Sequence, residues 1–146
     1  MQATASVAID ASIEAVWRTL TDDAKVPLWN PGYPRVSYSE GSRRADPTGQ
    51  AFILSFPAVG RHREVHGEYV LFSPPNRLVV RCHDEEKTSL VTYVLEQKGS
   101  HTSLTVLSES QYRSTVLQFF GRLLGPVYRA MARSSLNRLK RLVERG

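Results

Sequence analysis

The sequence has a single cysteine, Cys82, among its 146 residues, so no disulfide can form within the chain. Chains without disulfides are typical of reducing compartments. The first ten residues, MQATASVAID, also lack the charged start and the apolar run of a secretory signal peptide. We therefore expect a cytoplasmic protein that is not secreted.

Long apolar runs and the common catalytic motifs are missing as well. No stretch approaches the roughly 18 apolar residues of a transmembrane helix. The sequence contains no Gly-rich phosphate loop, no CxxC, no HExxH and no Gly-x-Ser-x-Gly. The four histidines, His62, His66, His83 and His101, do not form a metal-ligand pattern on a predicted helix. We predict no membrane span, no metal and no cofactor.

The overall composition is that of a folded globular protein. Hydrophobic residues make up 41% of the chain and charged residues 23%, which argues against disorder. A chain of this length can bury about two-thirds of its unfolded surface in one core. Because no repeat, linker or low-complexity segment interrupts it, we predict one domain over residues 1–146.

Positive charge is concentrated at the C-terminal end. From Arg113 onward there are eight Lys or Arg residues and one acid, Glu144, giving +7 within a total of +5. Residues 1–112 hold eleven basic and thirteen acidic residues, giving −2. Such a localised surplus suits either nucleic acid or anionic lipid, or it solvates the outside of a packed helix.

The helical periodicity of this segment favours the packed helix. At 100° per residue six apolar side chains share one broad face: Val116, Phe120, Leu123, Leu124, Val127 and Met131. Four cations cluster on the opposite face: Arg122, Arg129, Arg133 and Lys140. The basic side lacks the interleaved aromatic residues of a single-strand platform, so we predict no nucleic-acid binding. A peripheral membrane helix would show a similar pattern and stays open.

The remaining periodicities predict a strand, two short helices, six strands and a final long helix. The strands are expected at 3–10, 35–41, 50–57, 61–72, 76–84, 88–97 and 102–110, and the short helices at 11–22 and 23–29. Gly125-Pro126 either kinks the final helix or begins a new one. Seven antiparallel strands with one long helix predict an α+β fold, with the helix covering the buried face of a curved sheet.

Several segments carry a family resemblance. VAIDASIEAVWRTLTDDAKVPLWNPG resembles the start of the START-like SRPBCC superfamily, GEYVLFSPPNRLVVR its strand–proline turn–strand unit, and SLNRLKRLVE its closing helix. The polyketide cyclase/dehydrase-like and chaperone-ATPase-activator-like branches are the most similar. The resemblance implies a helix-grip fold in which the sheet wraps the long helix around an apolar cavity. It does not imply one chemistry, because such folds host many functions.

Our first functional hypothesis is binding, or transport, of a hydrophobic or aromatic small molecule or lipid between the sheet and the C-terminal helix. Strand parity and helix face predict the lining residues Val80, Leu95, Phe120, Leu124, Val127 and Met131. The alternatives are a cyclase/dehydratase-like enzyme and a protein–protein module of the co-chaperone type. Either a monomer or a homodimer is compatible with the sequence.

The strand at 61–72 holds the only candidates for acid–base catalysis. A strict period of two places His62, Glu64, His66 and Glu68 on one face together with Val70 and Phe72. If that face lined the cavity, His66 with Glu64 or Glu68 could act as a general base. Because burying four ionisable groups is costly, we expect this face to meet solvent and favour a binder over an enzyme.

Two further segments are expected to be unreactive. Cys82 alternates with Leu78 and Val80, which predicts a small buried side chain rather than a nucleophile, with Arg81 and His83 facing solvent. Residues 42–49, SRRADPTG, read as a solvated loop, with a lid over the cavity as the alternative.

Overall fold

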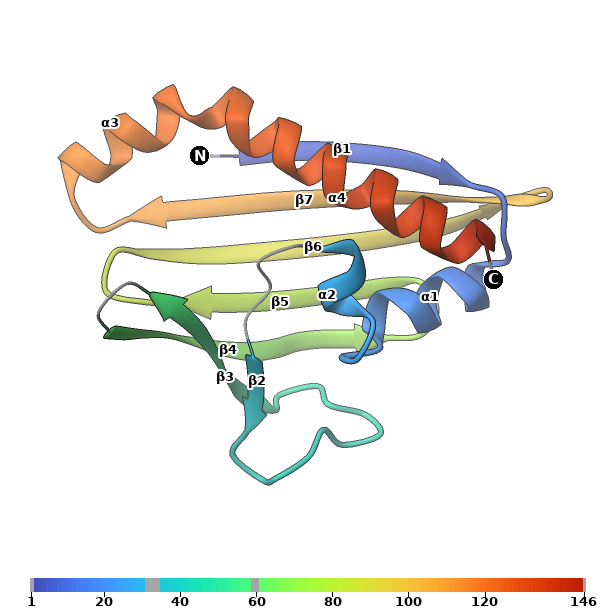
Figure 1. The fold of residues 1–146 in the computed structure, drawn as a ribbon, viewed down its shortest axis with the longest axis horizontal. Helices are drawn as coiled ribbons and strands as arrows, with labels where there is room; N and C mark the ends of the chain where they lie inside the picture. Colours follow the sequence, from blue (N-terminus) through green and yellow to red (C-terminus); the bar gives the residue numbers. More distant parts are fainter. Residues whose placement is uncertain (1, 31–34, 59–60, 146) are drawn as a thin grey trace.

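A single antiparallel sheet organises the molecule. The computed structural model describes residues 2–30, 35–58 and 61–145, apart from the side chains of residues 57, 58, 61 and 62. The strands are β1 (Gln2–Ile9), β2 (Arg35–Tyr38), β3 (Ala51–Ala58), β4 (Arg61–Ser73), β5 (Arg77–His83), β6 (Lys87–Lys98) and β7 (His101–Tyr112). They pair in the order β1-β7-β6-β5-β4-β3-β2 (Figure 1). The predicted α+β helix-grip architecture is confirmed.

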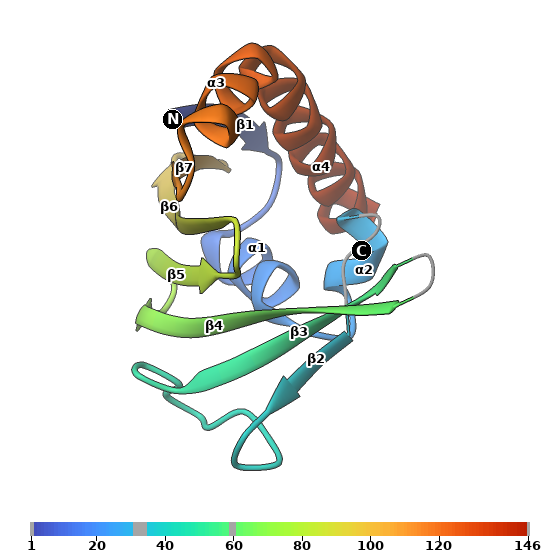
Figure 2. The same ribbon diagram turned by 90° about the vertical axis from the view of Figure 1, so that its left-hand side faces the viewer.

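The sheet is strongly curved, and the helices lie on its concave side. These are α1 (Ile13–Thr21), α2 (Val26–Trp29), α3 (Thr115–Leu123) and α4 (Gly125–Arg145). Figure 2 shows the sheet curling around α1 while α4 crosses the open side next to α2. The core joins the inner strand face to these helices, with Ile9, Val16, Leu104 and Leu139 completely shielded from solvent.

Local signals explain where the first two helices begin. The sequence offers Ser12 or Asp10 as the cap of α1. The structure uses Ser12, whose hydroxyl accepts a hydrogen bond from the Ala15 amide at 3.2 Å. The second helix is shorter than expected, because the Asp22 carboxylate accepts from the Ala24 amide at 3.0 Å and holds residues 22–25 in a turn. The prolines and glycine of NPGYP, residues 30–34, predict a stop after this helix, but residues 31–34 lie outside the described residues.

A bulge in β4 changes which side chains face inward. Tyr69 pairs with Val80 but Leu71 pairs with Val79, so Val70 is an extra residue in the ladder. The strict period of two across this strand is therefore wrong beyond Glu68. Phe72 lies on the inner face, with its ring centroid 5.1 Å from that of Trp17.

The final helical segment is divided, and its two parts bury different faces. Gly125 begins α4 with Pro126 in its first turn, so the helix starts anew rather than kinking. In α4 only Leu136, Leu139 and Val143 are buried, and they pack toward β1, α1 and α2.

The prediction that the apolar face of residues 116–131 packs on the core is wrong. Six side chains are 44–64% exposed: Val116, Phe120, Leu123, Leu124, Val127 and Met131. The reason is geometric, since Val127 and Leu136 are nine residues, or 2.5 turns, apart and point to opposite sides of α4. The opposing arginines at 122, 129 and 133 are exposed as expected.

Candidate functional site

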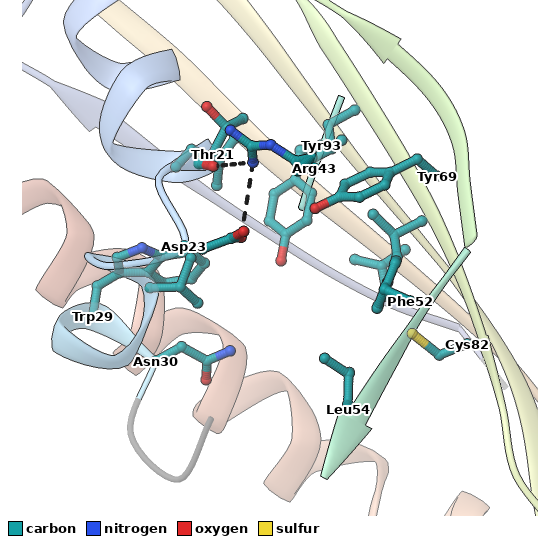
Figure 3. Close-up of a pocket in the computed structure, with 15 residues that line it drawn as sticks. Thr21, Asp23, Trp29, Asn30, Arg43, Phe52, Leu54, Tyr69, Cys82 and Tyr93 are labelled. Atoms are coloured by element: carbon teal, nitrogen blue, oxygen red, sulfur yellow. Dashed lines mark hydrogen bonds and ion pairs between the residues drawn. The ribbon is translucent and has the colours of Figure 1, made fainter. Parts of the chain in front are cut away.

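An apolar cavity of about 220 Å³ lies between the α1–α2 segment and the inner face of β3–β6. Its lining side chains come from both layers: Leu20, Thr21, Asp23, Val26, Trp29, Asn30, Arg43, Phe52, Leu54, Tyr69, Leu78, Val80, Cys82, Val91 and Tyr93. Figure 3 shows Arg43, Asp23 and Thr21 gathered on one side of this space, with Leu54 and Cys82 on the other. The cavity is therefore apolar with one polar end, as in many small-molecule sites.

The polar end is a connected network of side chains. The Tyr38 hydroxyl donates to the Asp23 carboxylate at 2.5 Å and lies 3.2 Å from the Tyr69 hydroxyl. The Arg43 guanidinium lies 3.8 Å from the same carboxylate and donates to the Thr21 carbonyl. Arg43 also stacks over the Phe72 ring at 5.6 Å. Because the charges of Arg43 and Asp23 offset each other, the cluster is polar but close to neutral.

The loop that carries Arg43 is held in place by a buried amide. Gln50 is 1% exposed. Its carbonyl oxygen accepts from the Arg44 amide at 2.9 Å, and its amide nitrogen donates to the Ser42 carbonyl at 2.8 Å. These bonds fix the backbone on both sides of Arg43. Residues 42–49 are thus not simply a solvated loop, since one of their side chains enters the cavity.

Burial controls the protonation of the network. The pKa of Tyr38 is raised, first by burial and then by its hydrogen bond to Asp23, so its hydroxyl remains a proton donor. For Arg43, burial acts to lower the pKa, but the Tyr69 hydroxyl and the Asp23 carboxylate outweigh it and the net shift is upward. The guanidinium therefore stays charged beside the cavity.

Away from the polar end, the titratable groups of the cavity wall are uncharged at neutral pH. Burial raises the pKa of the Cys82 thiol to about 11 and that of Tyr93 to about 12. At neutral pH both groups are protonated, which agrees with the prediction that Cys82 is not a nucleophile. The Trp29 indole N–H is buried and has no hydrogen-bond partner among the described residues.

The six predicted ligand-lining residues do not come together in one place. Val80 lines the cavity. Leu95 is 2% exposed and belongs to the packed core instead. Four helix residues lie on the exposed face of α3–α4 and away from the lining set: Phe120, Leu124, Val127 and Met131. The helical side of the cavity is formed by α1 and α2, because α4 enters the core only through Leu136, Leu139 and Val143.

The predicted acid–base candidates lie on the outer face of the sheet. His66 pairs with His83 across β4 and β5, and their rings stack with centroids 5.6 Å apart. Glu68 forms an ion pair with Arg81 at 3.2 Å, and Glu64 is exposed. None of these side chains lines the cavity. The side chain of His62 falls outside the described residues. A catalytic role would require these side chains to face the cavity, and they do not.

The polar residues of the cavity escaped the sequence analysis. Tyr69 could have been found, since it alternates with Val65 and Gly67 on the face opposite the charged run. Asp23 and Arg43 give no such signal, because they lie in a helix-linking turn and a loop without periodicity. Only the folded chain brings these two charges together from positions 20 residues apart.

Two features of the described residues bear on the class of site. In residues 2–30, 35–58 and 61–145 no group of three or more His, Cys, Asp or Glu side chains could hold a metal ion. Within the same ranges no helix is long and apolar enough to cross a membrane.

Comparison with known proteins places the chain in a family. No curated protein matches it in sequence. Among solved structures it is similar to TTHA0849 from Thermus thermophilus (16% identity, TM-score 0.72, covering 98% of this chain and 97% of that one). It also resembles CV1439 from Chromobacterium violaceum (20% identity, TM-score 0.69, covering 99% and 98%).

A third similar structure is DynU16, a putative protein in the dynemicin biosynthetic locus (20% identity, TM-score 0.70). The similarity covers 98% of this chain and 47% of DynU16. At these identities the three structures establish the fold alone. The family model described as polyketide cyclase/dehydrase and lipid transport matches residues 1–144. This match confirms the resemblance to the SRPBCC superfamily. The chain belongs to the polyketide cyclase/dehydrase and lipid transport family.

Proposed function

We propose that the protein binds and carries a compact hydrophobic molecule that has one hydrogen-bond-accepting group. The observation behind this proposal is the apolar cavity with Arg43, Asp23 and Tyr69 at one end. Its volume of about 220 Å³ is slightly below the roughly 300–1,000 Å³ of pockets for drug-sized ligands. A one- or two-ring aromatic compound or a short acyl chain is the ligand class that fits this space.

The polar end supports a ligand with an acceptor oxygen. Arg43 is cationic, and its guanidinium has N–H groups beyond the one that donates to Thr21, so it offers donors toward a carbonyl, phenolate or carboxylate. The Tyr38 proton is already donated to Asp23. The unpartnered Trp29 N–H adds a second donor group in the cavity wall. Because buried donors without partners are rare in native proteins, a ligand oxygen that accepts from Trp29 would explain why it is left free.

The test uses two fluorescent two-ring probes, the anionic dimethylaminonaphthalene sulfonate and the neutral dimethylaminonaphthalene. We expect each to bind with one-to-one stoichiometry. In Val91→Trp the new ring occupies the cavity, so affinity for both probes should fall by roughly tenfold or more. The matched control is Val94→Trp, a substitution on the same strand whose side chain faces outward. Equal binding by both variants would show that the cavity is not the binding site.

A second pair of variants tests the polar end. Arg43→Met should weaken the anionic probe by roughly tenfold while changing the neutral probe little, because a charge-assisted hydrogen bond is lost. Arg44→Met is the control, since Arg44 is exposed and pairs with Glu40 at 3.3 Å. If Arg43→Met and Arg44→Met behave alike, Arg43 does not receive the polar group of the ligand.

A further inference from the structure

The junction of α3 and α4 exposes a large apolar surface that the ligand cavity does not use. Seven side chains that are 44–64% exposed form this surface, which we term the α3–α4 apolar face: Val116, Phe119, Phe120, Leu123, Leu124, Val127 and Met131. The rings of Phe119 and Phe120 pack edge to face, with their centroids 5.9 Å apart. Contiguous apolar surfaces of this kind in soluble chains mark interaction sites.

Cations continue this surface along α4. Arg138 follows Met131 by seven positions and Val127 by eleven. Arg145 follows Val127 by eighteen positions. These spacings are close to whole numbers of helical turns, so the outward side of α4 is apolar in its first half and basic in its second. Arg141 extends the same basic stripe, and all three arginines are exposed.

The basic stripe, formed by Arg138, Arg141 and Arg145, has no acidic side chain on α3 or α4 that is free to pair with it. The one acid in the described part of α3 and α4, Glu144, is already held by Lys140 at 2.7 Å and by the Asp10 amide. None of the ion pairs found among the described residues includes Arg138, Arg141 or Arg145. The partner of this surface must therefore supply both apolar contact and negative charge.

We propose that the α3–α4 apolar face docks the protein on an anionic membrane surface. A bilayer offers acyl chains for the phenylalanine and leucine side chains and lipid phosphates for the arginines beside them. Both ribbon views place the α3–α4 turn at an outer edge of the molecule, where a flat surface can reach it (Figures 1 and 2). The N-terminal half of the outward face inserts, and the C-terminal half holds headgroups.

A second copy of the chain fits this surface less well. Two-fold pairing would place the same +7 segment of each copy against the other, and the segment has one acid to offset the repulsion. An anionic bilayer meets the same charge with attraction. The proposal does not rest on the ligand proposal, because no residue of the α3–α4 apolar face lines the cavity.

Flotation with lipid vesicles tests the proposal. The full chain should bind vesicles of phosphatidylcholine with roughly 30% phosphatidylserine and bind pure phosphatidylcholine at least tenfold more weakly. Phe119→Asp/Phe120→Asp should reduce binding to the anionic vesicles at least tenfold. The matched control is Leu28→Asp, since Leu28 is 64% exposed on α2 and should be dispensable. Circular dichroism would verify that the variants are folded.

Charge is tested separately with two triple variants of equal net charge. Arg138→Gln/Arg141→Gln/Arg145→Gln should abolish the preference for anionic vesicles, whereas Arg18→Gln/Arg44→Gln/Arg77→Gln should retain it. Three results would overturn the proposal: no binding to anionic vesicles, equal loss in the two triple variants, or sedimentation of the wild type as a dimer that Phe119→Asp/Phe120→Asp dissociates. The last result would assign the surface to a second copy.

Discussion

At the residue scale, the site depends on how a few polar side chains are embedded in apolar surroundings. Asp23 and Arg43 share one end of the cavity, where each lowers the cost of burying the other. The Tyr38 hydroxyl donates to the Asp23 carboxylate and lies within hydrogen-bond distance of the Tyr69 hydroxyl. At the opposite side, Cys82 has no such hydrogen-bond partners, and burial is the largest cause of the raised pKa of its thiol.

The reactivity of Cys82 therefore reports on the cavity. Its pKa is raised from 9.0 to about 11, so at pH 8 the native thiol should react with a disulfide reagent roughly a hundredfold more slowly than the urea-unfolded chain. A probe bound in the cavity should slow the reaction further. Stopped-flow absorbance measures both rates; equal rates for native and unfolded chains would mean that Cys82 is not buried beside the cavity.

The same shift gives a pH dependence of stability. Because the folded state has the higher pKa, it favours the protonated thiol. The contribution of the thiol to stability is fully present below pH 9 and is lost as the pH rises toward about 11. Urea unfolding of Cys82→Ala, which lacks the titrating group, should show a shallower loss of stability over this range. Parallel curves for the two proteins would contradict the assignment.

At the element scale, the position of α3 depends on one close approach. Gly121 lies against the ring of Tyr112 at the end of β7, and a Cβ atom added there would lie 2.6 Å from that ring. Gly125 opens α4, and a Cβ at that position would meet nothing within 4 Å. The two glycines thus have different roles in two adjoining helices.

This difference predicts opposite effects of the same substitution. Alanine normally stabilises a helix interior by about 1 kcal/mol over glycine. In Gly121→Ala the clash with Tyr112 should outweigh that gain and release α3 from β7, whereas Gly125→Ala should be neutral or slightly stabilising. Hydrogen exchange of residues 115–123 is the measurement. Unchanged protection in Gly121→Ala would show that α3 is not held by this contact.

At the scale of the whole molecule, the curvature of the sheet separates the C-terminal helices into an exposed and a buried portion. The strongest helix–sheet packing is between α4 and β1, at one edge of the sheet. Leu136 and Leu139 enter the core there, while Met131, one to two turns earlier, remains 60% exposed. The helix closes the fold with its second half and leaves its first half available to other partners.

Alanine substitutions along α4 should reveal this division. Leu139→Ala removes a fully buried side chain and should cost about 2–5 kcal/mol of unfolding free energy. Met131→Ala should change it by less than about 0.5 kcal/mol, because an exposed side chain loses little on truncation. Urea denaturation gives both values. A large loss in Met131→Ala would mean that the α3–α4 apolar face is covered within the molecule.

The order of elements, their approximate limits and the fold family could be read from the chain. Hydrophobic periodicity, proline and glycine punctuation and the Ser12 cap depend on neighbours within a few residues, so they are visible in one dimension. The outward position of Arg81 and His83 and the inert character of Cys82 followed from strand parity alone. The segments resembling the superfamily then supplied the helix-grip arrangement.

The cavity and the exposed face of α3–α4 followed from contacts between distant segments. Periodicity identifies an apolar face but carries no information on what covers it. The buried side that it predicts for α4 is therefore the wrong one. One bulge residue, Val70, reversed the direction of Phe72 beyond it. Arg43 and Asp23 meet because sheet curvature, a turn and a Gln50-fixed loop converge, and each of these is a property of the packed chain rather than of any window within it.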